Sequence, residues 1–424
     1  MKLIIEPARE QWSALCSRAT FDDSAIAERV GVILARVRQG GDSALRVITE
    51  EIDGCAPASF KVSAEEISEA ADSISPRLKD AIAQASANIE AFHRAQQCSM
   101  VEVETMPGVV CRRRQLPIGR VGLYIPGGSA PLFSTLLMLA IPAKIAGCRE
   151  IILCTPCNKE GKVAPAVLYA ASVCGVDTIY KLGGAQAVGA MAYGTESIRK
   201  VSKIFGPGNR YVTKAKQMVS AMGTAIDMPA GPSEVMVLAD ESADAAFVAS
   251  DFLSQAEHGP DSQAIAVCNN KSFAEEVARE IERQLALLPR GGIASKALEN
   301  SRILVFANRE DQIAFANEYA SEHLIISMRN PWDVAQQIEA AGSVFIGNYS
   351  PESAGDYASG TNHTLPTMGL AAAYSGIGLD SFMHSVTYQE LSREGLSSLA
   401  ATIVEMAQAE GLDAHANAVK IRLL

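Results

Sequence analysis

The alternation of short apolar runs with amphipathic stretches constrains the fold of this chain more than any other feature. From residue 121 to about 346, the apolar runs end in glycine or proline loops, and segments with helical periodicity follow most of them. This order is typical of mainly parallel sheets with helices on both faces. Two series of similar size predict an α/β fold with two Rossmann-like lobes. The predicted strands are 121–125, 151–154, 178–182, 203–205 and 226–228, then 235–238, 265–267, 303–306, 323–326 and 344–346.

The segments that flank the alternating region are predicted to be helical. Residues 22–51 and 63–93 carry apolar side chains at three-to-four spacing, and Ser63 and Glu66 have the order of a capping box. The tail from about residue 386 is again helical in character. We therefore expect an N-terminal helical region at 1–105, a first lobe at 106–232, a second lobe at 233–380 and a helical C-terminal tail at 381–424.

Charge and composition exclude several classes of partner. The 424-residue chain has a formal net charge of −11, which repels phosphate backbones, so no nucleic acid partner is expected. No apolar run is long enough to span a bilayer, and residues 1–10 lack the apolar core of a signal peptide. The nine cysteines are irregularly spaced and odd in number, which favours a reducing compartment. We expect a cytoplasmic protein that does not bind membranes.

Three glycine loops in the first lobe indicate a ligand site. Residues 125–129, 183–186 and 205–209 each follow a predicted strand and precede a predicted helix. Ligands bind at the carboxyl ends of parallel strands, where glycine lets the backbone approach a phosphate and the helix N-terminus offers free N–H groups. Any one loop is equally compatible with an ordinary tight turn, and only the occurrence of three favours a site. Because Gly-x-Gly-x-x-Gly is absent, the fingerprint alone does not identify a dinucleotide site.

Scattered polar residues could form a metal site. Gln255 and His258 lie three apart near a predicted helix end and share one helical face. Asp356 and His363 occur in a polar stretch long enough to favour a functional loop, and His415 lies in the tail. Two imidazoles, a carboxylate and an amide oxygen suit zinc, with manganese or cobalt as substitutes. Spacing does not establish that they converge, and His258 as a cap and His415 as a surface residue remain alternatives.

Glu322 and His323 directly precede a predicted strand and are candidates for a general acid/base pair. Adjacent residues in an extended segment point to opposite sides, so both can face one substrate only if the chain turns there. A surface pair is equally compatible with the sequence.

Cys154 and Cys157 form a Cys-x-x-Cys pair that predicts no zinc site, because a second pair is missing. The sequence around them is unlike thioredoxin. A buried strand cysteine is favoured over a redox thiol.

Several long motifs resemble those of the histidinol dehydrogenase family and occur in the family's order. The resemblance runs from about residue 20 to the end and is weaker before residue 60. Arg210 is a departure, since a smaller or apolar residue is expected there. The matching segments are 121–131, 203–209 (KIFGPGN), 227–234 (DMPAGPSE), 254–260 (SQAEHGP), 321–326 (SEHLII), 353–367 and 410–419.

The resemblance implies a role for each matching position. One zinc ion per subunit would be bound by Gln255, His258, Asp356 and His415. Glu322 and His323 would be the acid/base pair, and both they and the zinc ligands would also touch the substrate. Further substrate contacts would be Ser233, His363 and Glu410, and the NAD contacts would be Tyr124, Gln186 and Asn209.

The resemblance also implies an assembly and a reaction. The family forms an intertwined homodimer in which the tail, with Glu410 and His415, completes the partner's site. Its lobes are incomplete Rossmann folds that hold NAD weakly, which fits the missing fingerprint. The implied reaction is the oxidation of L-histidinol to L-histidine through histidinal, with two NAD and one water, at the end of histidine biosynthesis.

In that reaction His323 would take the alcohol proton and Glu322 would activate water, while zinc orients the substrate. Three alternatives remain open at this point. They are a dehydrogenase of the same fold acting on another small polar alcohol, a zinc-binding protein without catalysis, and a thiol redox protein that uses Cys154 and Cys157.

Overall fold

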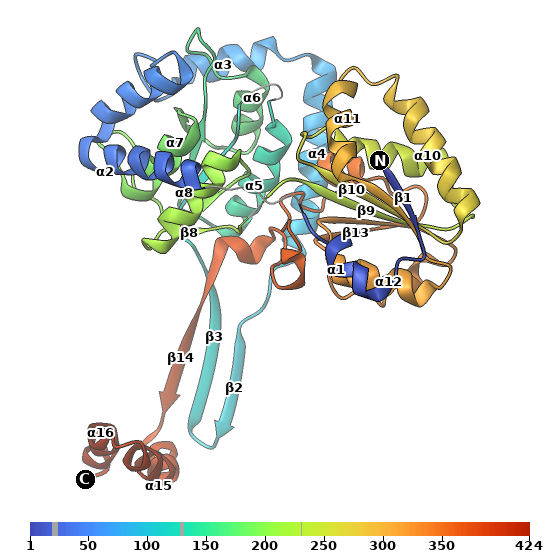
Figure 1. The fold of residues 1–424 in the computed structure, drawn as a ribbon. Coiled ribbons are helices and arrows are strands. Elements are labelled where there is room, and N and C mark those ends of the chain that lie inside the picture. The colour runs from blue at the N-terminus through green and yellow to red at the C-terminus, as the bar shows by residue number, and fades with distance from the viewer. Residues whose placement is uncertain (19–23, 128–130, 230) are drawn as a thin grey trace.

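The computed structural model describes residues 1–18, 24–127, 131–229 and 231–424. Within these ranges the strands form a six-stranded and a five-stranded parallel sheet, together with a three-stranded antiparallel sheet. The predicted α/β class with mainly parallel sheets is confirmed. Figure 1 shows two lobes side by side and a long arm that projects away from them.

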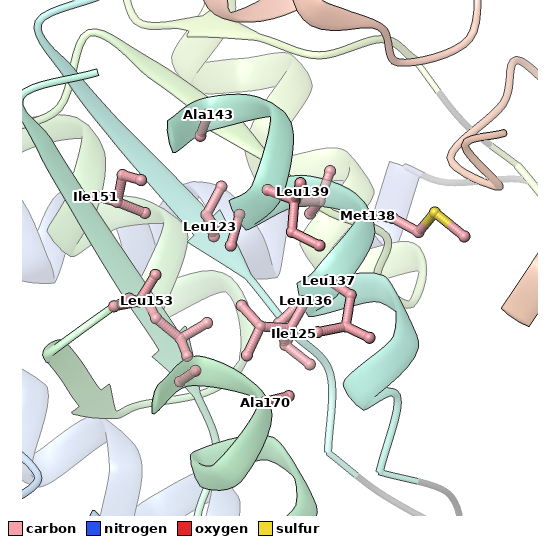
Figure 2. Close-up of a cluster of buried hydrophobic side chains, with 14 of the residues drawn as sticks. Leu123, Ile125, Leu136, Leu137, Met138, Leu139, Ala143, Ile151, Leu153 and Ala170 are labelled. Atoms are coloured by element: carbon pink, nitrogen blue, oxygen red, sulfur yellow. The ribbon is translucent and has the colours of Figure 1, made fainter. Parts of the chain in front are cut away.

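The five-stranded sheet forms the first lobe and has the order β6-β5-β4-β7-β8. Successive residues of β5 enter different apolar clusters: Ile151 and Leu153 pack on one face, and Ile152 and Cys154 on the other. Figure 2 shows Leu123, Ile151 and Leu153 of the first face with the leucines of α5. Helices cover both faces, so the strands are continuous apolar runs. The strands are β4 (Arg120–Tyr124), β5 (Glu150–Thr155), β6 (Thr178–Lys181), β7 (Lys203–Phe205) and β8 (Ala225–Ile226), and the helices are α5 (Phe133–Ala146), α6 (Pro165–Val173), α7 (Gly184–Tyr193) and α8 (Arg210–Ala221).

The six-stranded sheet forms the second lobe and has the order β1-β11-β10-β9-β12-β13. Its central strand, β9, is buried along its whole length. The strands are β1 (Lys2–Ile5), β9 (Glu234–Ala239), β10 (Gln263–Cys268), β11 (Arg302–Val305), β12 (His323–Ser327) and β13 (Ser343–Ile346). The helices are α1 (Trp12–Leu15), α9 (Ala245–Ala256), α10 (Lys271–Leu285), α11 (Gly291–Asn300), α12 (Arg309–Tyr319), α13 (Pro331–Ala335) and α14 (Glu352–Tyr357).

The N-terminal region consists mainly of helices that pack on the first lobe. Helix α2 (Ser24–Asp53) contacts α7 and α8, while α3 (Ala64–Ser73) contacts α6 and α4 (Pro76–Arg94) contacts α5. The predicted start of the first helix at Asp22 lies outside the described residues. The predicted capping box is confirmed, because Ser63 Oγ accepts from the Glu66 N–H at 3.2 Å and Glu66 Oε2 accepts from the Ser63 N–H at 3.0 Å.

The expectation of an entirely helical N-terminal region is wrong at its start. Residues Lys2–Ile5 form β1, which pairs in parallel with β11 at the edge of the second-lobe sheet. Four residues are too few to show a strand period, and the partner lies about 300 residues away in the chain, so local pattern cannot reveal this pairing.

An antiparallel sheet forms the arm, so the predicted helical tail is confirmed from Arg393 on but is wrong for the residues before it. Strand β14 (Met383–Leu391) pairs with β3 (Val109–Pro117), which pairs with β2 (Val101–Met106). Helices α15 (Arg393–Ala409) and α16 (Asp413–Leu423) follow at the far end of the arm, as Figure 1 shows. Both sides of this sheet are largely exposed, so its strands lack the apolar runs of the two parallel sheets.

No helix within the described ranges has both the length and the apolar content that crossing a membrane requires.

Candidate active site

A cavity of about 170 Å³ lies where the two lobes meet. The first lobe contributes residues that follow its strands, among them Gly206 and Asp227, and the second lobe contributes residues at the start of its strands, such as Ser233 and His323. The first lobe therefore follows the rule that ligands lie at carboxyl ends, whereas the second lobe uses its amino edge. Seven of the residues singled out from the sequence line this cavity: Ser233, Gln255, His258, Glu322, His323, Asp356 and His363.

The main chain of Glu234 holds both members of the acid/base candidate pair. Its N–H donates to Glu322 Oε2 at 2.8 Å, and its carbonyl oxygen lies 3.2 Å from His323 Nδ1. A carbonyl can only accept, so Nδ1 carries a proton and Nε2 is the ring nitrogen that can gain or lose one. Nε2 is buried without a hydrogen-bond partner among the described residues, and Asp356 Oδ1 is 3.6 Å away.

Glu322 and His323 meet the condition that both face one cavity. Glu322 ends the turn before β12 and His323 begins the strand, and Glu322 Oε2 lies 3.7 Å from His323 Nδ1. Both side chains are buried, so the alternative of a surface pair is wrong.

Three carboxyl groups surround the His323 imidazole. Burial raises the pKa of Glu322 and of Glu352 to about 8 each. Burial alone would lower the pKa of His323, but the charges of Glu352, Glu322 and Asp356 outweigh it and raise that pKa to about 10. The site thus concentrates negative charge in a buried place, where a divalent cation would be stabilised.

A candidate metal site lies beside this pair. His258 Nε2 is 4.0 Å from Asp356 Oδ2, and the ligating atoms of His258, Asp356 and Glu352 all lie within 4.8 Å of one another. Gln255, fully buried in the last turn of α9, faces Glu352 with its amide group, and its oxygen can accept from the Glu234 N–H at 2.9 Å. Imidazole, carboxylate and amide donors fit zinc.

Glu352 is a site residue that the sequence analysis missed. It lies one helical turn before Asp356 in α14, and the i, i+4 spacing places both carboxylates on one face of that helix. Its side chain is only 1% exposed. The Glu-x-x-x-Asp spacing was the available signal, but it is too common to identify a site.

His363 connects the lobes at the edge of the cavity. Its Nδ1 donates to the carbonyl oxygen of Asp356 at 2.7 Å, and its Nε2 lies 3.0 Å from Thr135 Oγ1 at the start of α5. These bonds use both ring nitrogens, so they fix the loop that carries Asp356 against the first lobe.

Glu410 and His415 are not near the cavity of their own chain. Both are exposed, Glu410 at the end of α15 and His415 in α16, at the tip of the arm. A single chain therefore presents Gln255, His258 and Asp356 without the fourth expected ligand.

The expected NAD contacts lie at the carboxyl edge of the first-lobe sheet. Tyr124 Oη accepts from the Gly184 N–H at 3.1 Å, and Gln186 Nε2 donates to Asp53 at 3.2 Å. Asn209 Oδ1 caps α8 by accepting two N–H groups at 3.1 Å each. These three residues follow or end β4, β6 and β7, while Gly128 and Ser129 of the first glycine loop lie outside the described residues.

The Cys154 thiol is unsuited to redox chemistry. It is fully buried in β5, and burial raises its pKa to about 12. The pKa of Cys157 is raised as well, chiefly by burial. Reactive cysteines need lowered pKa values, so this pair does not form a thiol redox site.

Comparison with known proteins shows the family of this chain. The sequence model described as histidinol dehydrogenase matches residues 16–423. The histidinol dehydrogenase of Bacteroides thetaiotaomicron is 53% identical over 423 residues, covering 100% of this chain and 99% of that protein. The one from Vibrio cholerae is 52% identical over 416 residues, covering 98% and 96%. The crystal structure of histidinol dehydrogenase from Elizabethkingia anophelis matches with a TM-score of 0.98 and 48% identity, covering 100% of this chain and 98% of that one.

Proposed function

The chain belongs to the histidinol dehydrogenase family of oxidoreductases, and from this we propose that it converts L-histidinol to L-histidine through histidinal. Each of the two oxidations would reduce one NAD, and one water would supply the second carboxylate oxygen. The observation that carries the proposal is the His323 imidazole at the cavity, whose Nδ1–H is fixed by the Glu234 carbonyl while Nε2 has no hydrogen-bond partner among the described residues.

In the first oxidation, His323 accepts the proton of the substrate hydroxyl. Its Nε2 is the atom available for that proton, because Nδ1 is occupied by its bond to Glu234. Proton transfer by a positioned side chain contributes on the order of 10²–10⁴-fold to a rate. NAD supplies the hydride acceptor in both oxidations.

In the second oxidation, Glu322 activates the water that adds to the aldehyde. Its carboxylate is buried beside His323 and accepts one N–H bond, from Glu234, among the described residues. Burial raises its pKa to about 8, which brings this carboxyl into the range suited to proton transfer near neutral pH.

Zinc would be held by Gln255, His258 and Asp356 of one chain, with His415 of a second chain as the fourth ligand. The buried carboxyl groups and the imidazole at this place support a cation of that kind. When bound, such a metal would orient the substrate through its amine and imidazole nitrogens.

A homodimer with exchanged tails would bring Glu410 and His415 to the partner's cavity. The arm carries apolar side chains that are at least half exposed in the single chain, namely Val101, Val103, Met406 and Ile421. Such surface is typical of protein interfaces.

The stoichiometry of NADH formation tests this function. Purified protein loaded with zinc should form two NADH per histidinol consumed, and His258→Asn should lose bound zinc and activity together. His384→Asn, which changes an exposed histidine of the arm, is the matched control and should keep both. Absence of NADH with histidinol would refute the proposal, and NADH formation with another small polar alcohol instead would favour a different dehydrogenase of this fold.

A further inference from the structure

We propose that Arg18 is a positioning residue for the reaction, because its ion pair with Glu234 fixes the main-chain groups that hold Glu322 and His323. This inference rests on the proposed function. It assigns a role in catalysis to a residue that does not line the cavity between the lobes.

The ion pair between Arg18 and Glu234 is buried and bidentate. Arg18 Nε and Nη2 each lie 3.0 Å from one oxygen of the Glu234 carboxylate. The side chains are only 11% and 1% exposed. A bidentate guanidinium–carboxylate pair fixes direction as well as distance, and a lysine cannot reproduce that geometry.

Arg18 is itself held by several groups. Its Nη1 donates to the Cys16 carbonyl at 2.9 Å and its Nη2 to the Tyr319 carbonyl at 2.6 Å. The guanidinium carbon lies 3.7 Å from the centroid of the Tyr319 ring. On the other side, Glu234 Oε1 also accepts from the Met368 N–H at 2.8 Å. The Glu234 side chain is therefore anchored from two separate segments, at Arg18 and at Met368.

Glu234, anchored in this way, positions Glu322 and His323 through its own main-chain N–H and carbonyl groups. Its N–H holds the Glu322 carboxylate and its carbonyl holds His323 Nδ1, so both candidates depend on the orientation of one residue. Glu234 is the first residue of β9, and the carbonyl before it, that of Ser233, accepts from the Gln263 N–H at 3.1 Å. Its preceding neighbour, Ser233, already lines the cavity. A displacement there would move the base and the water-activating carboxylate together.

Removing the guanidinium would leave a buried carboxylate without its cation, and relaxation of Glu234 would follow. A misplacement of about 1 Å in a positioned group can reduce a rate about 100-fold. The natural test is Arg18→Met, which keeps much of the side-chain length and removes the charge. Arg9→Met is the matched control, because Arg9 stacks on Trp12 in the same N-terminal segment, 4.8 Å from its ring, and has no bond to Glu234 among the described contacts.

We expect Arg18→Met, assayed as zinc-loaded enzyme, to lower kcat at least about tenfold for both histidinol and histidinal. The KM for NAD should stay within about threefold, because the first lobe is untouched. The midpoint of the pH profile of kcat should also shift, whereas a smaller folded fraction would lower the whole profile without moving it. Arg18→Lys should recover part of kcat, and Arg9→Met should resemble the wild type.

If Arg18→Met folds poorly, two further variants test the inference. They are Glu234→Gln and the double variant Arg18→Met/Glu234→Gln. The double variant has no buried uncompensated charge, and it should lose no more activity than the more impaired single variant, since the two side chains act as a unit. Unchanged kcat and pH midpoint in folded Arg18→Met, or in the double variant, would overturn this inference. If the wild type itself forms no NADH with histidinol, the proposed function fails instead.

Discussion

Single side chains in the cavity differ in what holds them, and this difference separates their roles. His323 has one ring nitrogen bonded to a main-chain carbonyl and one without a hydrogen-bond partner among the described residues, which suits the proposed base, while Glu322 accepts a main-chain N–H beside it. The identity of these two residues was predictable because they are adjacent and polar before an apolar strand. Their shared support from Glu234 was not, since it depends on two neighbouring strands in register, with His323 opposite Val235.

Glu322→Gln should slow the oxidation of histidinal more than that of histidinol. The amide keeps the size of the side chain and can still accept the Glu234 N–H, but it cannot take a proton from water. Single-turnover rates from each starting compound would measure the two steps separately. Equal losses in both steps would contradict a water-activating role for Glu322.

Asp251 should make the folded protein less stable as the pH rises. Burial raises its pKa from an ordinary 3.8 to about 7, so between these values the folded state binds a proton that the unfolded state has lost. Stability therefore falls as pH rises from about 4 to about 7, by up to about 4 kcal/mol, and is level above that.

Asp251→Asn should remove this contribution, because asparagine stays neutral and can still accept the N–H of Glu352. The urea midpoint, measured at pH 5 and pH 8 with a chelator present, should change less in the variant than in the wild type. Asp72→Asn, at an exposed position in α3, should leave the wild-type difference intact. The same pH difference in Asp251→Asn and the wild type would show that Asp251 ionises normally.

At the scale of helices and strands, a strand could be predicted where both faces of its sheet are buried. Apart from the largely exposed β1, the strands of the two parallel sheets were predicted within a few residues, because helices cover both of their faces and make them continuous apolar runs. The segments of β2, β3 and β14 were missed because they are largely exposed and mix charged with apolar residues. Pairing of β14 with β3 joins segments more than 250 residues apart, which local sequence does not encode.

The conformation of the loop after β7 requires a glycine at one position. Gly206 has φ 123°, and a Cβ there would lie 2.0 Å from the Tyr124 carbonyl oxygen. Gly206→Ala should therefore lower the thermal unfolding midpoint and raise the KM for NAD, since the loop leads to Asn209. Gly223→Ala is the matched control, because Gly223 has φ 97° and no atom within 4 Å of the added carbon.

Backbone strain alone, on the order of 1–3 kcal/mol, is common to both glycine variants. Any further loss in Gly206→Ala measures the collision with β4. If the two variants change stability and KM equally, close approach of the loop to Tyr124 is not what requires glycine.

At the scale of the whole molecule, the arm is the feature that local sequence patterns predicted least well. The cavity gathers residues from both lobes, and the polar motifs were sufficient to name seven of them. Lys216 and Asp227, a buried ion pair at the cavity, were missed because each lies in an ordinary amphipathic or strand-end segment. The distance between the tail and its own cavity was implied only by the family resemblance, because it follows from an exposed sheet whose strands the local sequence does not reveal.

Mixed dimers test whether tails are exchanged. A dimer of one His415→Asn chain and one Glu322→Gln chain has one cavity with both defects and one with neither, if each tail completes the partner's cavity. Refolding an equal mixture should restore about a quarter of wild-type activity, since half of the dimers are hybrids. If each chain completed its own cavity, the mixture would be no more active than the two variants kept apart.

The pairing of β1 with β11 also determines when the second-lobe sheet can be completed during protein synthesis. At about 5–20 residues per second, a ribosome needs about 15–60 s after making Ile5 before the partner strand at Arg302–Val305 exists. Strand β1 thus has no partner strand while the residues between β1 and β11 are made, and the segment ending in Arg18 waits with it. The sheet of the second lobe can therefore gain β1 only after β11 has been made.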